Sequence, residues 1–443
     1  MPIATHDQLS FFAWPRSLPK RDSAIQLIKY MGSKREIVDF VADTIEAALG
    51  GVEGRTVLDL MAGTSSVGYA LSARHRVIAN DIQHYSCALS KALLMTTGDL
   101  PDGDALWDFL EPHIRENREA LERILGPHLA TEQKILSSTD FGEDFIKVYD
   151  KFTSEYPYAG KLKHSPTYNG LCRTFGNLID ERRQNSSEFP YCLFTLYFGN
   201  AYFGLAQSIE FDSIRFAIDQ ALGKTSQSRW VALACLMHAA SYCTPGPGHF
   251  AQFRALNSPA VCEDILRYRN RSPKAYFLQK WQEFRKEHRA PIYVNTCAKE
   301  DYRKALKLYL PEADLVYADP PYSFVHYSRF YHALETLVRY DYPECQFYGR
   351  YRSDRHQSPF CVRTKVKKAF QDIIVPVAKA KKKLVISYAN TGMISLEDLT
   401  QECEVEFGPS RVRIISSDYL HATMGRRGDK HREVQELLIV CGV

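Results

Sequence analysis

Apolar positions near the start of the chain follow first a helical and then a strand-like spacing. Residues 37–45 place apolar side chains at helix spacing, and a pair of glycines ends the pattern. Two short apolar runs follow at residues 56–60 and 77–81, separated by a glycine-bearing turn and a helix-like segment. Strand, helix and strand in this order form a β–α–β unit, so the pattern predicts a parallel sheet.

This rhythm stops near residue 99 and resumes near Pro291. The intervening residues include charged, helix-like stretches at 111–129 and 279–288 and an aromatic, helix-compatible stretch at 175–223. The later pattern predicts strands at Ile292–Val294, Leu315–Ala318 and Lys383–Tyr388, a helix over Tyr302–Tyr309, and a terminal antiparallel pair at Arg411–Ile415 and Val434–Val440.

The simplest architecture is an α/β fold with one doubly wound, Rossmann-like sheet that a mostly helical insertion interrupts. We expect residues 1–98 and 291–443 to build the sheet. Residues 99–290 form the insertion, which is a candidate recognition domain because it lacks the rhythm of the sheet.

Composition adds a few limits to this picture. The chain has 443 residues, 45% of them hydrophobic and 24% charged, which is typical of a globular protein. A net charge of +4 permits a polyanionic partner without requiring one. Eleven cysteines without a Cys-x-x-Cys pair, no secretory leader pattern and no apolar run near 20 residues predict a cytoplasmic protein that does not enter a membrane.

The first candidate site is the turn from Asp59 to Gly68. An acid and small residues at the end of a strand let the backbone approach a ligand closely, and Asp81 at the end of the next strand is placed to accept hydrogen bonds from ribose hydroxyls. The dinucleotide fingerprint is absent because Ser65 occupies the place of its second glycine. Alone, this pattern also fits an ordinary turn of any α/β fold.

The second candidate site is Asp319-Pro320-Pro321-Tyr322, directly after an apolar strand. Two prolines fix the backbone and remove two amide donors. An acid and a carbonyl are then held beside an aromatic ring, an arrangement that accepts both hydrogens of an exocyclic amine while Tyr322 stacks on a flat ring. The alternative is a proline-rich turn without a catalytic role.

Two further groups carry less information. The loop Lys29-Tyr30-Met31-Gly32-Ser33-Lys34 precedes a helix, where lysines and free amides bind carboxylates, although a solvated loop has the same composition. Cys235, His238, Cys243 and His249 have loose spacing on an apolar helix, which favours core packing over a zinc site, so no metal is expected.

Taken in chain order, the motifs at residues 29–34, 59–64, 80–81 and 319–322, with a long insertion before the last, resemble those of Dam-like DNA adenine-N6 methyltransferases. The resemblance covers residues 25–98 and 290–443 and, within the insertion, 199–207 and 209–212. The resemblance implies a methyltransferase sheet, S-adenosyl-L-methionine as cofactor and double-stranded DNA as partner, in restriction-modification or a related form of DNA marking with a cognate restriction enzyme. It implies a catalytic role for Asp319, Pro320, Pro321 and Tyr322, and cofactor contacts from Lys29, Tyr30, Gly32, Lys34, Asp59, Ala62, Gly63, Thr64, Asp81 and Ile82.

This chain departs from the family pattern at two places. Ser65 stands where the family usually has glycine, which would narrow the cofactor turn. Near the cofactor's adenine, where the family often has an acid, the chain reads Asn295-Thr296-Cys297, and Asp301 comes later. The residue that contacts the cofactor's adenine ring stays open.

The resemblance and the chemistry of the corner predict one mechanism. The amine of adenine is a poor nucleophile, so accepting its hydrogens at Asp319 and the Pro320 carbonyl exposes its lone pair to an activated methyl group. A paired adenine must first be flipped out of the duplex, and Tyr322 would stack on it. A stretch at 347–356 that alternates aromatics with arginines is a candidate to clamp phosphates and fill the gap left by the flipped base, or else a solvated loop.

Other functions stay open at this point. A cytosine-N4 or RNA base methyltransferase uses a similar corner, often with Ser in place of the acid, and Asp319 favours adenine. A non-catalytic DNA-binding module does not need Lys34, Asp59, Asp81 and Asp319 together. A NAD-dependent oxidoreductase is disfavoured because the glycine fingerprint is missing. The recognition sequence, the strand preference and the oligomeric state do not follow from the sequence.

Overall fold

The computed structural model describes most of the chain, and all structural statements below concern these residues. They are residues 3–5, 25–30, 34–138, 142–162, 168–246, 248–321, 324, 326–389, 392–421 and 434–443.

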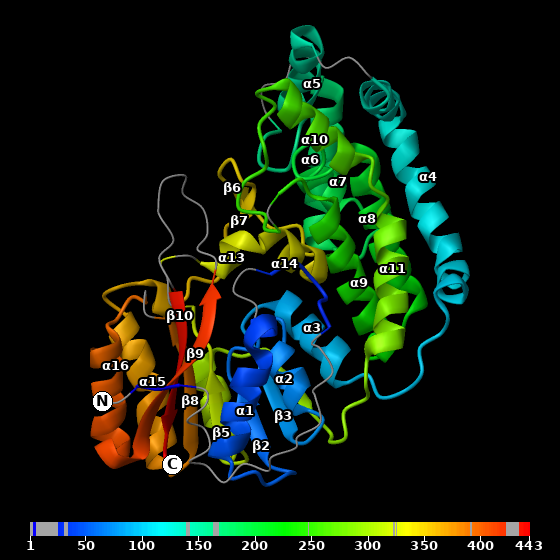
Figure 1. The fold of residues 1–443 in the computed structure, drawn as a ribbon. Coiled ribbons are helices and arrows are strands. Elements are labelled where there is room, and N and C mark those ends of the chain that lie inside the picture. The colour runs from blue at the N-terminus through cyan, green and yellow to red at the C-terminus, as the bar shows by residue number, and fades with distance from the viewer. Residues whose placement is uncertain are drawn as a thin grey trace.

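One eight-stranded sheet organises the lower part of the molecule (Figure 1). Its strand order is β1-β9-β10-β8-β5-β2-β3-β4, and β10 is antiparallel to both of its neighbours, whereas the other neighbouring pairs are parallel. The strands are β1 (Ile3–Thr5), β2 (Thr56–Asp59), β3 (Arg76–Asn80), β4 (Thr296–Ala298), β5 (Leu315–Ala318), β8 (Lys383–Ala389), β9 (Val412–His421) and β10 (Val434–Cys441).

Strand β2 is the point where the chain reverses its direction across the sheet. It pairs with β3 on one side and with β5 on the other, and the insertion separates these two strands from each other in sequence. In open α/β sheets, ligands bind beside the carboxyl ends of the strands at such a point. The topology therefore marks the end of β2 as the place to look for a site.

Alternating side chains along the strands supply two apolar faces. Val57 packs into the core on one face and Leu58 into the core on the other. The first face is covered by η2 (Lys34–Ile37), α1 (Val38–Ala48), α2 (Ser66–Leu71) and α3 (His84–Leu94), and the second by α12 (Tyr302–Tyr309), α15 (Val366–Lys379) and α16 (Leu396–Phe407). This is the predicted doubly wound, Rossmann-like arrangement.

The insertion forms a helical tower above the sheet, with α4 along its outer edge (Figure 1). It starts where α3 ends and returns to the sheet at β4. Its helices are α4 (Gly103–Leu136), α5 (Glu143–Glu155), α6 (Asn169–Gln184), α7 (Leu193–Tyr197), α8 (Leu205–Ala221), α9 (Gln227–Cys243), α10 (Pro259–Arg269) and α11 (Pro273–Glu287).

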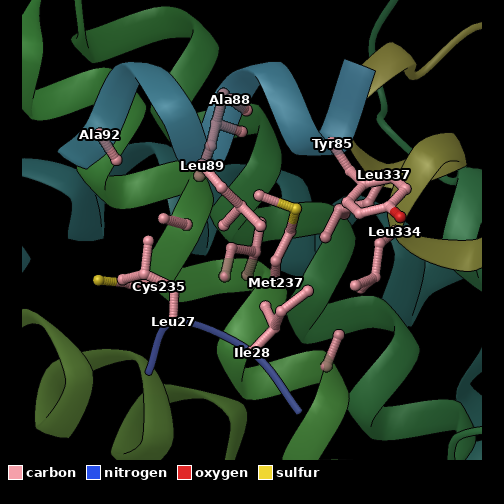
Figure 2. Packing of buried hydrophobic residues seen from close by; sticks show 14 of the residues in the cluster. Leu27, Ile28, Tyr85, Ala88, Leu89, Ala92, Cys235, Met237, Leu334 and Leu337 are labelled. Carbon is pink, nitrogen blue, oxygen red and sulfur yellow. The ribbon is translucent and has the colours of Figure 1, made fainter. Parts of the chain in front are cut away.

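Helix α9 packs directly on α3, so the insertion shares a hydrophobic core with the sheet. Figure 2 shows Met237 of α9 beside Leu89 of α3, with Leu27 and Ile28 of the N-terminal segment below them. Short elements lie at the junction above the sheet: α13 (Tyr327–Phe330), α14 (His332–Arg339), β6 (Cys345–Gln346) and β7 (Tyr351–Arg352) (Figure 1). The single-turn helices η4 (Pro359–Cys361) and η5 (Pro409–Arg411) precede α15 and β9.

One predicted strand is wrong. The apolar run Ile292–Val294 is not a strand, and its ends are exposed, with Ile292 at 72% and Val294 at 89%. The strand β4 begins at Thr296 instead, where its residues pair with β3. Apolar composition marked the wrong residues because this short edge strand takes its position from pairing with β3, which a local pattern does not contain.

Among the helices of the described ranges, none combines the length and the apolar character that crossing a membrane requires.

Candidate active site

Three aspartates stand at the carboxyl ends of three neighbouring strands and line one pocket. Asp59 ends β2, Asp81 follows β3 and Asp319 follows β5. Strands far apart in sequence are neighbours in the sheet, so residues separated by 260 positions in the chain meet at this edge. The reversal point of the topology and the candidate chemistry therefore coincide.

The turn after β2 is held by Asp81. The Gly63 amide donates to Asp81 Oδ2 at 3.0 Å, and the Gln83 amide donates to Asp81 Oδ1 at 2.9 Å. Gly63 has a φ of 53°, a left-handed conformation that glycine adopts without strain. Burial raises the pKa of Asp81, while the two amide donors counteract part of that rise. Each carboxylate oxygen keeps a second lone pair for a hydroxyl of a ligand.

Asp59 is buried at 1% exposure, and its Oδ1 atom has no hydrogen-bond partner among the described residues. Burial, followed by the negative charges of Asp319 and Asp81, raises its pKa well above the usual range. A buried carboxylate oxygen without a donor is unfavourable, and a cationic donor in the pocket would relieve it. Asp59 Oδ1 is therefore able to accept a hydrogen bond from a ligand donor, such as an ammonium group.

Asp319 forms an ion pair with Lys34, with 3.1 Å between Oδ1 and Nζ. Lys34 also contacts Glu436 Oε1 at 2.5 Å. Burial raises the pKa of Asp319 to about 6 and Glu436 adds to the rise, while Lys34 opposes it. The aspartate keeps 21% side-chain exposure beside the pocket, so a ligand reaches it.

Aromatic rings form one wall of the pocket. Tyr30 stacks on Tyr331 with 4.6 Å between ring centroids and on Tyr327 at 5.5 Å. A Cβ atom added to Gly63 would lie 3.6 Å from the Tyr30 hydroxyl, so the glycine turn and this ring are close neighbours. The wall therefore fixes Tyr30 directly above the cofactor turn that the sequence predicted.

The structure brings together most of the residues that the sequence singled out. The pocket lining includes Tyr30, Lys34, Asp59, Ala62, Gly63, Thr64, Asp81, Ile82, Asp319, Pro320 and Pro321. Lys29 is not part of the lining, because its ammonium lies 4.1 Å from the ring centroid of Tyr242 in the insertion. Gly32 and Tyr322 lie outside the described residues, so their roles stay predictions.

Further chain segments line the pocket beyond the residues that the sequence assigned to the cofactor or to catalysis. The loop after β4 contributes Glu300 together with Asp301, whose late position the sequence analysis noted, and the segment after α14 contributes His356 and Ser358. The Asp301 carboxylate is held by Arg303, which lowers its pKa against the effect of burial. An acid after the last strand of the parallel row was a usable signal. His356 ends the stretch 347–356 that the sequence suggested for DNA contact rather than for the pocket, and nothing local marks Ser358.

Ser65 does not narrow the cofactor turn. It adopts a left-handed φ of 58°, and its hydroxyl lies 2.5 Å from that of Ser90 on α3. The side chain is fully buried away from the residues that line the pocket. A serine therefore replaces glycine at some backbone strain, offset by this hydrogen bond.

The arginines of the stretch 347–356 are mostly turned inward. Arg350 is buried and donates to the Tyr197 carbonyl at 2.7 Å, and Arg352 is buried in a bidentate ion pair with Asp341. These side chains hold the β6–β7 hairpin in place, so they are not free to clamp phosphates. The exposed side chains at its tip are Phe347 at 69% and Tyr348 at 62%.

The expected absence of a metal site concerns Cys235, His238, Cys243 and His249. Both cysteines are buried and free, and His238 contacts the Leu27 carbonyl at 2.9 Å through Nδ1. Within the described ranges, no group of three or more potential ligands is placed to hold a metal ion.

The chain matches the family model of D12 class N6 adenine-specific DNA methyltransferases over residues 30–123 and 266–398, which together make up about half of it. The two segments contain the strands that carry Asp59, Asp81 and Asp319, and the gap between them falls in the helical tower.

Relatives among characterised proteins carry modification-enzyme names. The chain is 20% identical to Modification methylase LlaI of Lactococcus lactis subsp. lactis over 92% of its own length and 54% of that protein. It is 20% identical to Modification methylase StsI of Streptococcus sanguinis over 93% and 51% of the two chains. A shorter match, 31% identical, covers 29% of the chain and 19% of Type II methyltransferase M.FokI of Planomicrobium okeanokoites.

The chain spans about half of the length of the LlaI and StsI methylases. Its own matched residues nevertheless include the whole row of acids at the carboxyl edge of the sheet. The fold, the pocket and the family model agree, and the chain belongs to the D12 class of N6 adenine-specific DNA methyltransferases.

Proposed function

We propose that this protein transfers a methyl group from S-adenosylmethionine to the N6 amine of an adenine in double-stranded DNA. The observation that carries the proposal is the row Asp81, Asp59 and Asp319 around one pocket at the edge of β3, β2 and β5. Three acids at this position serve a ligand that offers hydroxyls, a cation and an amine, in that order across the sheet.

The residues of the pocket fit S-adenosylmethionine, the cofactor of the D12 class. The unsatisfied Oδ1 of Asp59 matches the ammonium of the methionine part, and the remaining lone pairs of Asp81 match the ribose hydroxyls. The turn at Gly63 leaves room for close approach, since no side chain projects there. When bound, the cofactor supplies a methyl group that is already activated by its sulfonium.

The order of the strands also orients this ligand. Ile82, Glu300 and Asp301 line the pocket beyond β3 and β4, on the side away from Asp319. We place the adenine ring of the cofactor there, against Ile82, with its polar edge toward the acids of this loop. The methionine end then lies toward β2 and β5, where Asp319 stands.

At the target adenine, Asp319 and the Pro320 carbonyl accept the two amine hydrogens and expose the nitrogen lone pair toward the methyl donor. Both residues line the pocket, which supports this role. A strong base is not needed, because the chain chiefly aligns and desolvates the reactants. Tyr322, which lies outside the described residues, would stack on the flipped base.

For DNA recognition, we propose that the helical insertion supplies most base-edge contacts, because it stands above the sheet on the side of the pocket's junction elements (Figure 1). Base-edge contacts specify sequence, whereas phosphate contacts only position the protein. Exchanging residues 99–290 with those of a relative should therefore change the methylated sequence. A soluble, active chimera that kept the original target would contradict this.

The decisive experiment is transfer of tritium from labelled S-adenosylmethionine to DNA, RNA or protein, with the product nucleoside identified by mass spectrometry. We expect N6-methyladenine in DNA, and we expect Asp319→Ala to lose transfer by about a hundredfold or more while keeping its affinity for the cofactor. N4-methylcytosine, label in RNA alone, or no transfer by the parent protein would each assign a different function.

Two further proposals concern the setting of the enzyme. All eleven cysteines are free, which supports a reducing cytoplasm. The relatives' names, modification methylase, support pairing with a restriction enzyme. Finding a restriction gene beside that of this protein, and protection of host DNA from its product, would test this.

A further inference from the structure

Lys34 is held between two buried carboxylates. Its Nζ atom lies 3.1 Å from Asp319 Oδ1 and 2.5 Å from Glu436 Oε1. The Lys34 side chain is 7% exposed and that of Glu436 is fully buried. Ser387 donates a hydrogen bond from Oγ to the same oxygen of Glu436. Lys34 thus forms ion pairs with both acids. The group of Lys34, Asp319 and Glu436 carries one net negative charge when all three side chains are ionised.

The sheet builds this group by alternation. Val385 on β8 and Leu438 on β10 face the side covered by α1, and so do Ser387 and Glu436, which lie two residues away along the same strands. The parallel strands end at this edge, whereas β10 begins there because it runs in the opposite direction. The β9–β10 register shifts between Gln435 and Leu437, directly at Glu436. Next to the pocket, polar side chains therefore take the place of apolar ones on this face of β8 and β10.

The groups that face Asp319 come from five elements. Lys34 lies on η2, Tyr317 on β5, Asp59 on β2, Ser387 on β8 and Glu436 on β10. Glu436 and burial raise the pKa of Asp319, whereas Lys34 and Ser387 lower it, and the balance lies near 6. A carboxylate at this balance accepts a proton near neutral pH far more readily than an exposed one does.

We propose that Glu436 is a positioning residue. By forming a second ion pair with Lys34, it weakens the hold of Lys34 on Asp319 and thereby makes Asp319 the acceptor of the proton released by methyl transfer. The inference rests on the proposed function. Methyl transfer forms the bond from N6 to carbon and breaks the bond from carbon to sulfur in the donor. The electron pair of one N6–H bond stays on nitrogen, and its proton passes to Asp319. The group of Lys34, Glu436 and Asp319 then has no net charge.

The central test is the variant Glu436→Gln, which keeps the shape of the side chain and removes its charge. The variant thus removes a negative charge that raises the pKa of Asp319, so the proton affinity of Asp319 falls. We expect the acidic limb of the single-turnover rate to move down by roughly one pH unit. At pH 5 the variant should retain about a fivefold larger fraction of its own plateau rate, while the plateau itself falls severalfold because the acceptor is weaker.

Three other variants make the result specific. Glu436→Asp keeps the charge and should leave the midpoint close to that of the parent. Ser387→Ala removes a hydroxyl that lowers the pKa of Asp319 and should move the limb in the opposite direction, toward higher pH. Glu46→Gln is the matched control, because Glu46 is also buried and ion-paired, with Arg74 at 2.6 Å, but lies on α1 away from the pocket lining. A general loss of structure does not produce shifts of opposite sign.

A second readout does not depend on turnover. Carbon-13 labelling of aspartate carboxyls, with the Asp319 signal identified by its absence in Asp319→Asn, reports the titration of this group directly. We expect a midpoint near 6 in the parent protein and a lower midpoint in Glu436→Gln. Equal midpoints in the two proteins would overturn the inference. If the parent protein made no N6-methyladenine, the proposed function would fail, while this titration would still decide the role of Glu436.

Discussion

Two buried aspartates, one in the pocket and one in the insertion, differ in how the chain satisfies their carboxylate oxygens. Asp59 is 1% exposed and Asp212 on α8 is fully buried. Asp212 accepts from the Phe194 amide and the Thr195 amide, both at 2.8 Å, from the Thr195 hydroxyl at 2.7 Å and from the Tyr340 hydroxyl at 2.5 Å. Asp59 Oδ1 has no such partner among the described residues.

The direction of the pKa shift does not distinguish Asp59 from Asp212. Burial raises the pKa of Asp212 to about 6 and that of Asp59 well above its usual value. The difference lies in whether the chain itself satisfies the carboxylate. In the insertion it does, since Glu132 likewise accepts from the first amides of α8, at Leu205 and Ala206. An unsatisfied buried acid therefore indicates a ligand, whereas a satisfied one indicates a structural joint.

The largest expected difference is between two separate variants, Asp212→Ala and Asp59→Ala. Asp212→Ala leaves four buried donors without an acceptor and should lower the free energy of unfolding by about 3 kcal/mol. Asp59→Ala should change stability little but weaken binding of the cofactor by about ten- to a hundredfold, since it removes a charge-assisted hydrogen bond. Denaturant unfolding and calorimetric titration measure the two effects. Equal stability losses, or unchanged binding in Asp59→Ala, would remove the distinction.

A smaller effect is expected from Asp319→Asn, through its pH dependence. The folded pKa of Asp319, about 6, lies above the value in an unfolded chain, so the carboxyl stabilises the fold below the unfolded value and loses this contribution as pH rises through 6. Near pH 8 the variant should therefore be more stable than the parent by about 2 kcal/mol, with the gain disappearing between pH 6 and pH 4. Melting curves across this range check the sign, and a loss of stability at pH 8 would refute it.

The smallest effect concerns the exposed tip of the β6–β7 hairpin. Phe347→Ala should lower affinity for duplex DNA about fivefold, at the lower end of what one stacked base contributes, and leave cofactor binding unchanged. Val405→Ala on α16 is a suitable control, since Val405 is 74% exposed and Phe347 is 69% exposed. Fluorescence anisotropy with a labelled duplex measures this. If both variants bound DNA equally well, the hairpin tip would not be a contact.

Sequence reasoning succeeded where the signal is local. Short apolar runs that end with an acid identified β2, β3 and β5 together with Asp59, Asp81 and Asp319. The β–α–β order predicted the parallel sheet, and the observed strand order brings these acids to one edge. The pattern of apolar residues also identified α12 with its bounds and the antiparallel pair β9–β10.

It failed where the decisive partner is distant in sequence. Glu436 lies in a predicted strand, but its contact with Lys34 joins residues 402 positions apart. In the sequence, Arg350 and Arg352 have the pattern of surface cations. In the structure, they donate to the Tyr197 carbonyl and the Asp341 carboxylate. Cys235, His238 and Cys243 are buried, as the local apolar spacing around them indicates.

The core shared by α3 and α9 also bears on how such enzymes diverge. Helix α9 packs on α3 through residues such as Met237 and Leu89 (Figure 2), so we expect mutations there to disturb the insertion and the sheet together. The far end of the tower has a separate small apolar cluster, which α4, α5 and α10 form around Tyr149, Phe152 and Ile265. We therefore expect substitutions at this outer tip to leave the pocket intact more often than substitutions in the core that α3 and α9 share.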